Sequence, residues 1–261
     1  MWDRALLKKN AKVAFTRNYV ACVIACLITM VLGGGMANYS ININIGEQEQ
    51  QYTFSSYQDM YNQIEQFMNS ITPEMLMAIS IGSLLVFVLA IASITFVSNI
   101  MTVGCNRYFL ENREHQTEIV KIFYSFQGGR YVKTVWKMFL RDLYVWAWSL
   151  LLVIPGIIKS YAYIMVPFLL AENPDMEQKR VFELSEEMMR GHKWEAFVLQ
   201  LSFIGWNLIS SISGGLVGVF YVAPYYHATW TEYYSALKAE AQAKGLFAPH
   251  ELQGAGEPEV I

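Results

Sequence analysis

The distribution of charged residues constrains this chain more than any other feature. Four stretches contain no Asp, Glu, Lys or Arg, namely 18–46, 75–106, 143–158 and 196–231. Only 16% of all residues are charged, against about 25% in soluble domains. Because one membrane crossing needs about 20 apolar residues, each stretch is a candidate for insertion into a bilayer. The pattern therefore argues against an ordinary water-soluble enzyme.

The lengths of these stretches predict an all-α polytopic membrane protein with about six transmembrane helices. The third apolar region runs on to Ala171 and is broken by Pro155-Gly156, and the fourth is broken by Gly214-Gly215. Both pairs are turn signals, so we interpret each region as a tight helical hairpin. The alternative has four crossings, with the broken regions as re-entrant loops or long kinked helices. The helices expected in the six-crossing version lie near 19–37, 75–104, 138–155, 157–171, 195–212 and 215–232.

Basic residues predict the orientation, because Lys and Arg gather on the cytoplasmic side in short loops. No Lys or Arg lies between Arg17 and Arg107, so the loop 38–74 is expected outside. Both chain ends and the segments 105–137 and 172–194 are expected in the cytoplasm, and the first apolar run is expected to remain a membrane helix rather than a cleaved secretory signal. The expected organisation is a single transmembrane domain, 1–235, with cytoplasmic segments 1–18, 105–137 and 172–194 and a flexible cytoplasmic tail, 236–261.

A short pattern recurs before three of the expected membrane regions. A basic residue next to Asn or Gly is followed by an aromatic residue at Arg17-Asn18-Tyr19, at Gly129-Arg130-Tyr131 and from Arg190 to Trp194. Asn and Gly suit the end of a helix, and Tyr and Trp suit the headgroup layer. We interpret the pattern as an internal repeat, although any helix that enters a membrane from the cytoplasm acquires similar residues.

Two segments outside the expected crossings have apolar residues at helical spacing. The stretch from Asn173 to Gly191 is predicted to be an amphipathic helix at the inner interface. In the external loop, a similar stripe of apolar residues predicts a second helix. This helix either binds a partner or packs on the outer ends of the chain's own helices, and we favour the packing interpretation. The candidate partner-binding residues of this stripe are Tyr57, Tyr61, Ile64 and Phe67.

Signatures of catalysis and metal binding are absent from the sequence. Cys22, Cys26 and Cys105 do not form a disulfide framework and are interpreted as buried small residues. The four histidines form no His-Glu-x-x-His motif. Glu186-Glu187 and the following Arg190 approach the Glu-Glu-x-x-x-Arg signature of intramembrane proteases but are one residue too close. We therefore expect no catalytic residues, no metal and no cofactor, and the net charge of −3 does not favour nucleic acid as a partner.

Lys159 is the ionisable residue between the two arms of the first expected hairpin. An ionisable side chain at membrane depth is by default a functional candidate. It either snorkels to the outer interface, which we favour, or points inward and holds an anionic group. Tyr163, in the same hairpin, and His227, in the last expected helix, complete the candidate ligand-binding set.

Two segments carry a resemblance to a known family, IPGIIKSYAYIMVPFLLAENPDM at 154–176 and LSEEMMRGHKWEAFVLQLSFIGW at 184–206. The chain resembles the bacterial integral-membrane family called domain of unknown function 975 over nearly its whole length. It is also distantly similar to the membrane portion of some glycerophosphodiester phosphodiesterases. The resemblance implies a multi-pass protein of a bacterial plasma membrane. It supplies no active site to carry over.

Three functions follow as hypotheses. The first is a non-enzymatic membrane protein that binds or moves a lipid-like, or other small hydrophobic or anionic, molecule. The second is a membrane scaffold, or a regulatory or immunity partner of another membrane system, that acts through the external loop. The third, a membrane-embedded enzyme, ranks last because the ionisable candidates lie at different expected depths. The expected partners are the lipid bilayer and either an anionic lipid or another membrane protein.

Overall fold

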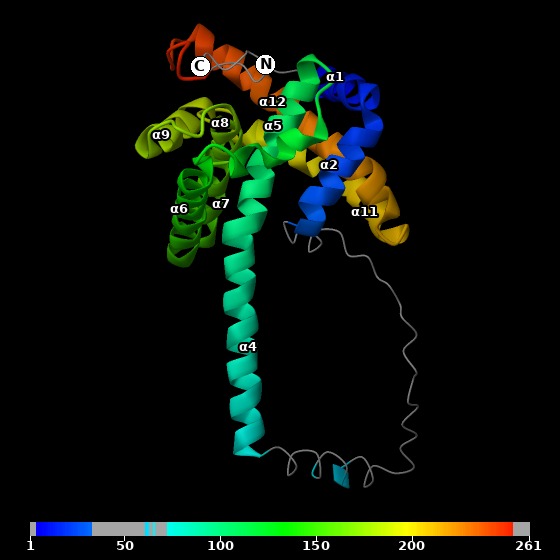
Figure 1. The fold of residues 1–261 in the computed structure, drawn as a ribbon, viewed down its shortest axis with the longest axis vertical. Coiled ribbons are helices and arrows are strands. Elements are labelled where there is room, and N and C mark those ends of the chain that lie inside the picture. The colour runs from blue at the N-terminus through cyan, green and yellow to red at the C-terminus, as the bar shows by residue number, and fades with distance from the viewer. Residues whose placement is uncertain (1–3, 33–60, 63–64, 66–71, 253–261) are drawn as a thin grey trace. The chain divides into compact units, whose positions relative to one another are not determined.

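The structure, a computed structural model, describes residues 4–32, 61–62, 65 and 72–252. Its regular elements in these ranges are all helices, which confirms the all-α fold class. The chain divides into two compact units, Met1–Ile41 with Ser93–Ile261, and Asn42–Ala92. Figure 1 shows the course of the chain.

Helices of several kinds build the first unit. In chain order they are α1 (Arg4–Arg17), α2 (Tyr19–Leu32), the π-helix η2 (Ile94–Ser98), α5 (Asn99–Glu114), the 3-10 helix η3 (Ile119–Phe126), α6 (Arg130–Leu151), α7 (Val153–Ala162), α8 (Val166–Glu172), α9 (Gln178–Met188), α10 (Lys193–Leu201), α11 (Ile204–Ile212), the π-helix η4 (Gly218–Val222) and α12 (Ala223–Ala243).

The second unit contains most of α4 (Pro73–Ser93). Pro73 suits the first position of a helix because the amide hydrogen that proline lacks would have no partner there, and the Thr72 hydroxyl accepts a hydrogen bond from the Met75 backbone N–H at 3.3 Å. The apolar side chains from Leu84 to Leu89 are exposed. A run of exposed apolar residues on one helix is compatible with a lipid environment.

Helix α5 is the central element of the first unit. Most of its residues are buried, and it contacts α1, α2, α6, α8, α12 and η3. Gly104 permits the closest of these crossings, because a Cβ at this position would lie 2.7 Å from the carbonyl carbon of Ile122 in η3. The expected cytoplasmic segment 105–137 thus begins in the middle of a helix that is surrounded by protein.

The first expected hairpin is present, but its turn is not at Pro155-Gly156. Helices α6 and α7 pack side by side (Figure 1), and the chain reverses at Leu152, which is extended with φ −159° and ψ 139°. Pro155 lies in the first turn of α7, where proline is tolerated. Gly156 instead allows close packing, since a Cβ there would lie 2.7 Å from Cα of Ser149.

The second expected hairpin breaks where the sequence predicts. Gly214 and Gly215 have φ angles of 62° and 88°, in the left-handed region that glycine adopts without strain. The ring of Trp206 in α11 lies 5.1 Å from that of Tyr221 in η4, which packs the two arms together. The second arm extends further than expected, because α12 runs to Ala243.

Helix boundaries coincide with all three places of the proposed repeat. Helix α2 begins directly after Asn18, α6 begins after Gly129 with a φ of 70°, and α10 begins shortly after Gly191 with a φ of 88°. Asn18 is also anchored to α5, because its side-chain amide donates to Asn112 Oδ1 at 3.1 Å. The predicted helix ends are confirmed, and the repeat itself stays a prediction.

The amphipathic helix expected from Asn173 to Gly191 is present as α9. Val181, Phe182, Leu184 and Met188 are buried, whereas the sequence placed this apolar stripe at the membrane interface. They pack into the core of the protein, where the Phe182 ring lies 5.2 Å from that of Tyr163. This apolar face is therefore covered by other helices of the same chain.

Two helical stretches among the described residues are long and apolar enough to cross a membrane, Val153–Glu172 and Lys193–Ile212. A third crossing is available if α1 and α2, bent by 95°, are counted together. Six crossings are not confirmed. Large apolar side chains are exposed at the turns of both hairpins, including Ile154 at 73% and Ile212 at 88% exposure.

The segment expected to form a flexible tail, 236–261, is packed over much of its described part. Leu237 and Ala241 of α12 are buried, as are Phe247 and Leu252 beyond it. Arg180 of α9 holds this end of the chain, with Nε 2.8 Å from Glu251 Oε1. The compact domain therefore extends beyond the expected boundary at 235.

Candidate functional site

A cavity between the helices, here called the main pocket, has a volume of about 640 Å³. Residues of α5, α6, α7, α8, α10 and α12 line it. Both its size and its mixture of aromatic and polar side chains are typical of small-molecule sites, which span about 300 to 1,000 Å³. The residues on which the argument depends are Arg141, Tyr161, Tyr163, Gln200, Tyr226 and His227.

Arg141 supplies the cationic group of the main pocket. Its Nε and Nη2 both donate to Asp142 Oδ1, at 3.0 and 2.6 Å, while Asn99 donates to Asp142 Oδ2 at 2.6 Å. Asp142 and Asn99 therefore orient the guanidinium. Among the described residues, the other terminal nitrogen of Arg141 has no protein acceptor, and a planar guanidinium suits carboxylate or phosphate.

Aromatic and amide groups form another part of the wall of the main pocket. The Tyr161 hydroxyl in α7 donates to Gln200 Oε1 in α10 at 2.7 Å, and the rings of Tyr161 and Phe197 meet edge to face at 6.3 Å. Tyr226 and Trp230 continue the wall along α12. These contacts bring together helices that lie far apart in sequence.

Two of the three predicted ligand-binding residues, Tyr163 and His227, line the main pocket, and Lys159 does not. Lys159 instead places Nζ 2.6 Å from Glu186 Oε1 of α9 and 5.3 Å from the centre of the Tyr163 ring. Burial opposes ionisation of Glu186, but hydrogen bonds from Lys159 and Tyr163 outweigh it and lower the pKa of this carboxyl. Lys159 therefore points toward other helices of the protein. The sequence analysis had favoured the other orientation, in which Lys159 snorkels to the outer interface.

A second cavity of about 440 Å³, here called the side pocket, shares Gln200, Tyr226 and His227 with the main pocket. Hydroxyl and amide groups of Thr29, Ser98, Thr102 and Asn207 also line it. Cys26 lies in the same wall. His227 thus stands between two cavities.

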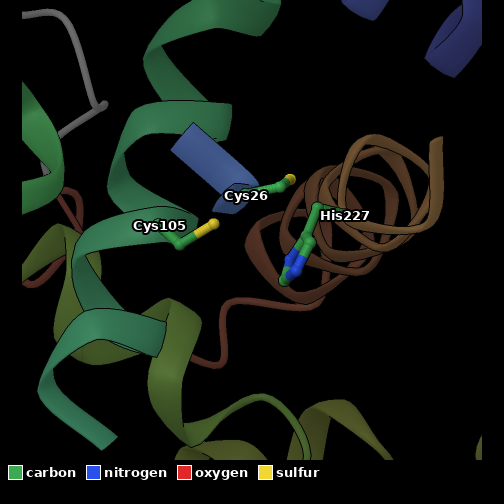
Figure 2. A group of neighbouring side chains, drawn as sticks. All are labelled: Cys26, Cys105 and His227. Carbon is green, nitrogen blue, oxygen red and sulfur yellow. The ribbon is translucent and has the colours of Figure 1, made fainter. Parts of the chain in front are cut away.

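Figure 2 shows that Cys26, Cys105 and His227 lie close together and form a cluster. Cys26 and His227 also line the side pocket. They come from α2, α5 and α12, and their sulfur and imidazole nitrogen atoms all lie within 4.8 Å of one another. The ring of His227 is stacked on Phe109 at 5.5 Å and meets Tyr226 edge to face at 5.9 Å. The burial expected for the cysteines is confirmed. Their approach to His227 escaped the sequence analysis, because residues from three distant segments form no spacing motif.

A buried ion-pair network on α5 is a second feature that the sequence did not predict. Arg107 Nε lies 2.6 Å from Glu111 Oε1, and the two side chains are only 9% and 3% exposed. Glu111 also accepts from the Thr117 hydroxyl at 2.9 Å, and Arg107 donates to the carbonyl of Ala171 in α8 at 3.2 Å. The spacing of four residues is a visible signal, but it equally describes a solvated helix face. Glu111 Oε2 also lies 3.6 Å from Nζ of Lys121 in η3. We interpret this network as structural, since it joins α5 to η3 and α8.

The predicted partner-binding stripe lies largely outside the described residues. Tyr57, Ile64 and Phe67 belong to the ranges that the structure does not describe. Tyr61 is helical and 61% exposed. Partner binding by this segment stays a prediction.

The fold and pockets define a class first: an all-helical protein that has two or three candidate membrane spans and polar-lined cavities between its helices. Comparison with known proteins then gives the family. The chain belongs to the family described as "Protein of unknown function (DUF975)", which matches residues 5–241. No curated protein and no solved structure matches it, so the similarity to glycerophosphodiester phosphodiesterases has no support.

Proposed function

We propose that this protein is a non-enzymatic membrane protein that binds a lipid-like molecule with an anionic headgroup in the main pocket. The observation that carries the proposal is the composition of that pocket. It combines one oriented guanidinium, from Arg141, with aromatic side chains from several helices. In this arrangement the headgroup contacts Arg141, and the apolar part of the ligand lies against Tyr161, Phe197 and Trp230.

The charge of the main pocket supports an anionic ligand. Among the described residues that line it, Arg141 is the permanent cation and no carboxylate is present. Asp142 orients Arg141 from outside the pocket, so a bound phosphate or carboxylate does not face a like charge in the pocket wall. Charge-assisted hydrogen bonds to a guanidinium are about twice as strong as neutral ones, which favours such a headgroup over a neutral one.

The position of the apolar surface supports a ligand that arrives from a bilayer. The exposed apolar residues at the turn of α6 and α7 include Leu150, Leu151 and Val153, each more than 65% exposed. An exposed apolar surface of this kind marks a membrane or protein contact. Together with the candidate spans, it supports insertion of these turns in a membrane, and the basic segments support cytoplasmic chain ends.

The non-enzymatic assignment rests on the chemistry of the lining groups. Among the residues that line the main pocket, His227 is of the type that most often acts as a general acid or base, and the Ser160 hydroxyl donates to the Ile157 carbonyl at 2.8 Å. A hydrolase of the serine type needs a base within hydrogen-bond reach of its nucleophile. No described contact joins Ser160 to His227.

Native mass spectrometry of the protein, extracted with its surrounding lipid, tests this function. We expect one anionic lipid per chain to survive delipidation, and Arg141→Gln to reduce that bound fraction about tenfold, the effect of losing about 1.4 kcal/mol. The matched control is Lys133→Gln, on the same helix but outside the main pocket and paired with Asp175. Equal loss of lipid in the two variants, or no retained lipid in the wild type, would overturn the proposal.

A further inference from the structure

Cys26, Cys105 and His227 have the donor set of a metal centre. Two thiolates and one imidazole are ligands that zinc prefers, and three protein ligands with an open fourth position are typical of zinc sites that bind water. The sulfur and nitrogen atoms lie within 4.8 Å of one another. We propose that this cluster binds one Zn²⁺ ion, independently of the ligand in the main pocket.

The geometry requires only a small adjustment. Zn–S bonds of about 2.3 Å in a tetrahedral site place two sulfurs about 3.8 Å apart. The sulfur and nitrogen atoms now lie up to 4.8 Å apart. Side-chain rotations that move these atoms by about 1 Å would bring them to the spacing of a zinc site. All three ligands are on helices, and two of them, Cys26 and Cys105, are buried, so the backbone already holds them in place.

The surroundings of the cluster are compatible with a bound cation. The His227 ring stacks on Phe109 and meets Tyr226 edge to face, and these contacts restrict the orientation of the imidazole. The side pocket adjoins Cys26 and His227, and hydroxyl and amide groups line it. It thus offers room for a water molecule as the fourth ligand, together with polar groups that orient this water.

Cys22 provides an internal comparison. It lies on the same helix as Cys26 and is also buried, but its sulfur lies 3.7 Å from the Tyr108 hydroxyl and 3.5 Å from the Asn112 amide nitrogen. Cys22 is therefore held by oxygen and nitrogen groups of α5 and does not belong to the cluster. A substitution at Cys22 changes the same residue type in the same helix without removing a proposed zinc ligand.

The experiment measures zinc content and affinity of the full-length protein purified under reducing conditions. We expect one zinc ion per chain by elemental analysis. Cys26→Ser, Cys105→Ser and His227→Gln should each weaken zinc binding by about 100-fold or more, because loss of even an outer-shell partner costs about 10- to 100-fold. Cys22→Ser should retain wild-type affinity in the same chelator competition.

Replacement of zinc by Co²⁺ in the wild type gives a readout that does not depend on the folding of variants. We expect the thiolate-to-cobalt charge-transfer absorption and the intense visible bands of a tetrahedral site. Absence of these bands, absence of zinc, or equal loss of zinc in Cys22→Ser would overturn the proposal. So would a metal-free protein in which thiol alkylation after denaturation reveals a Cys26–Cys105 disulfide.

Discussion

Lys159 of α7 and Glu186 of α9 form an ion pair with Nζ 2.6 Å from Oε1. Glu186 belongs to the segment expected in the cytoplasm, and Lys159 to a segment expected within the membrane. The pair therefore joins a candidate membrane span to the amphipathic helix α9. Lys159 also lies 5.7 Å from the centre of the Trp148 ring in α6, so one cation links three helices.

The Lys159–Glu186 pair is expected to contribute modestly to stability. Both side chains are partly exposed, 27% and 39%, and such pairs contribute about 0.2 to 1 kcal/mol. A double-mutant cycle of Lys159→Met and Glu186→Gln, followed by denaturant unfolding in micelles, should give a coupling energy in this range. Lys179→Met is the control, because Lys179 is 80% exposed and lies 3.6 Å from Glu183, and should have almost no effect. Lipid retention by Lys159→Met should remain unchanged, and loss of lipid in this variant would return Lys159 to the binding site.

Gly104 is expected to tolerate no side chain. A Cβ would lie 2.7 Å from the carbonyl carbon of Ile122, so Gly104→Ala must push η3 away from α5. Overpacking of this kind costs about 1 to 3 kcal/mol, which thermal or denaturant unfolding measures. Gly205→Ala in α11 is the matched control, because nothing lies within 4 Å of its added Cβ and alanine favours a helix. Equal destabilisation by both variants would contradict the close crossing.

The buried pair of Arg107 and Glu111 is expected to matter far more than exposed pairs. Glu111→Gln leaves a guanidinium that is nearly inaccessible to solvent without its counter-charge, and breaking a buried pair from one side costs about 3 to 5 kcal/mol. The control, Asp175→Asn, removes the partner of Lys133, whose side chain is 60% exposed, and should cost less than about 1 kcal/mol. If both variants lose a comparable free energy of unfolding relative to wild type, the network on α5 is solvated and the prediction is wrong.

Docking of the C-terminal segment is expected to weaken in acid. Hydrogen bonds from Arg180 and from the Ala248 backbone N–H hold the pKa of Glu251 below its ordinary value of 4.5. A carboxyl whose folded-state pKa is depressed stabilises the fold above its unfolded pKa, and this contribution is lost as the pH falls through the lower folded value. Protection of the amides from Leu246 to Leu252, measured by hydrogen exchange relative to the intrinsic exchange rate at each pH, should therefore be high at neutral pH and decrease as the pH falls below 4.5. Glu251→Gln should lower this protection at neutral pH and remove its pH dependence, and an unchanged protection profile would count against the contact.

Elements governed by local chemistry were predictable from the sequence. The left-handed backbone at Gly214 and Gly215 follows from the freedom of glycine, and the apolar stripe at helical spacing predicted the amphipathic helix α9 with Val181 and Leu184 on its apolar face. The turn at Leu152 was not predictable in this way. Proline fits the first turn of a helix as well as a loop, and the role of Gly156 depends on contact with Ser149 in the neighbouring helix.

The site was predictable only in part, because it is assembled from distant segments. Tyr163 and His227 were identified from the sequence, and both line the main pocket. Arg141 was not identified as a candidate from the sequence, since its position beside the pocket depends on how α6 packs. Cys26 and Cys105 come from helices separated by the external loop, so no spacing rule brings them together with His227.

Photo-crosslinking with an anionic lipid that carries a photoreactive group in its acyl chain tests the central claim most directly. If the main pocket holds the lipid, adducts should concentrate on the peptides that contain Tyr161, Phe197 and Trp230, which line it. Arg141→Gln should diminish these adducts about tenfold while Lys133→Gln leaves them unchanged. Adducts confined to the exposed apolar turns around Ile154 and Ile212, with no dependence on Arg141, would contradict the account.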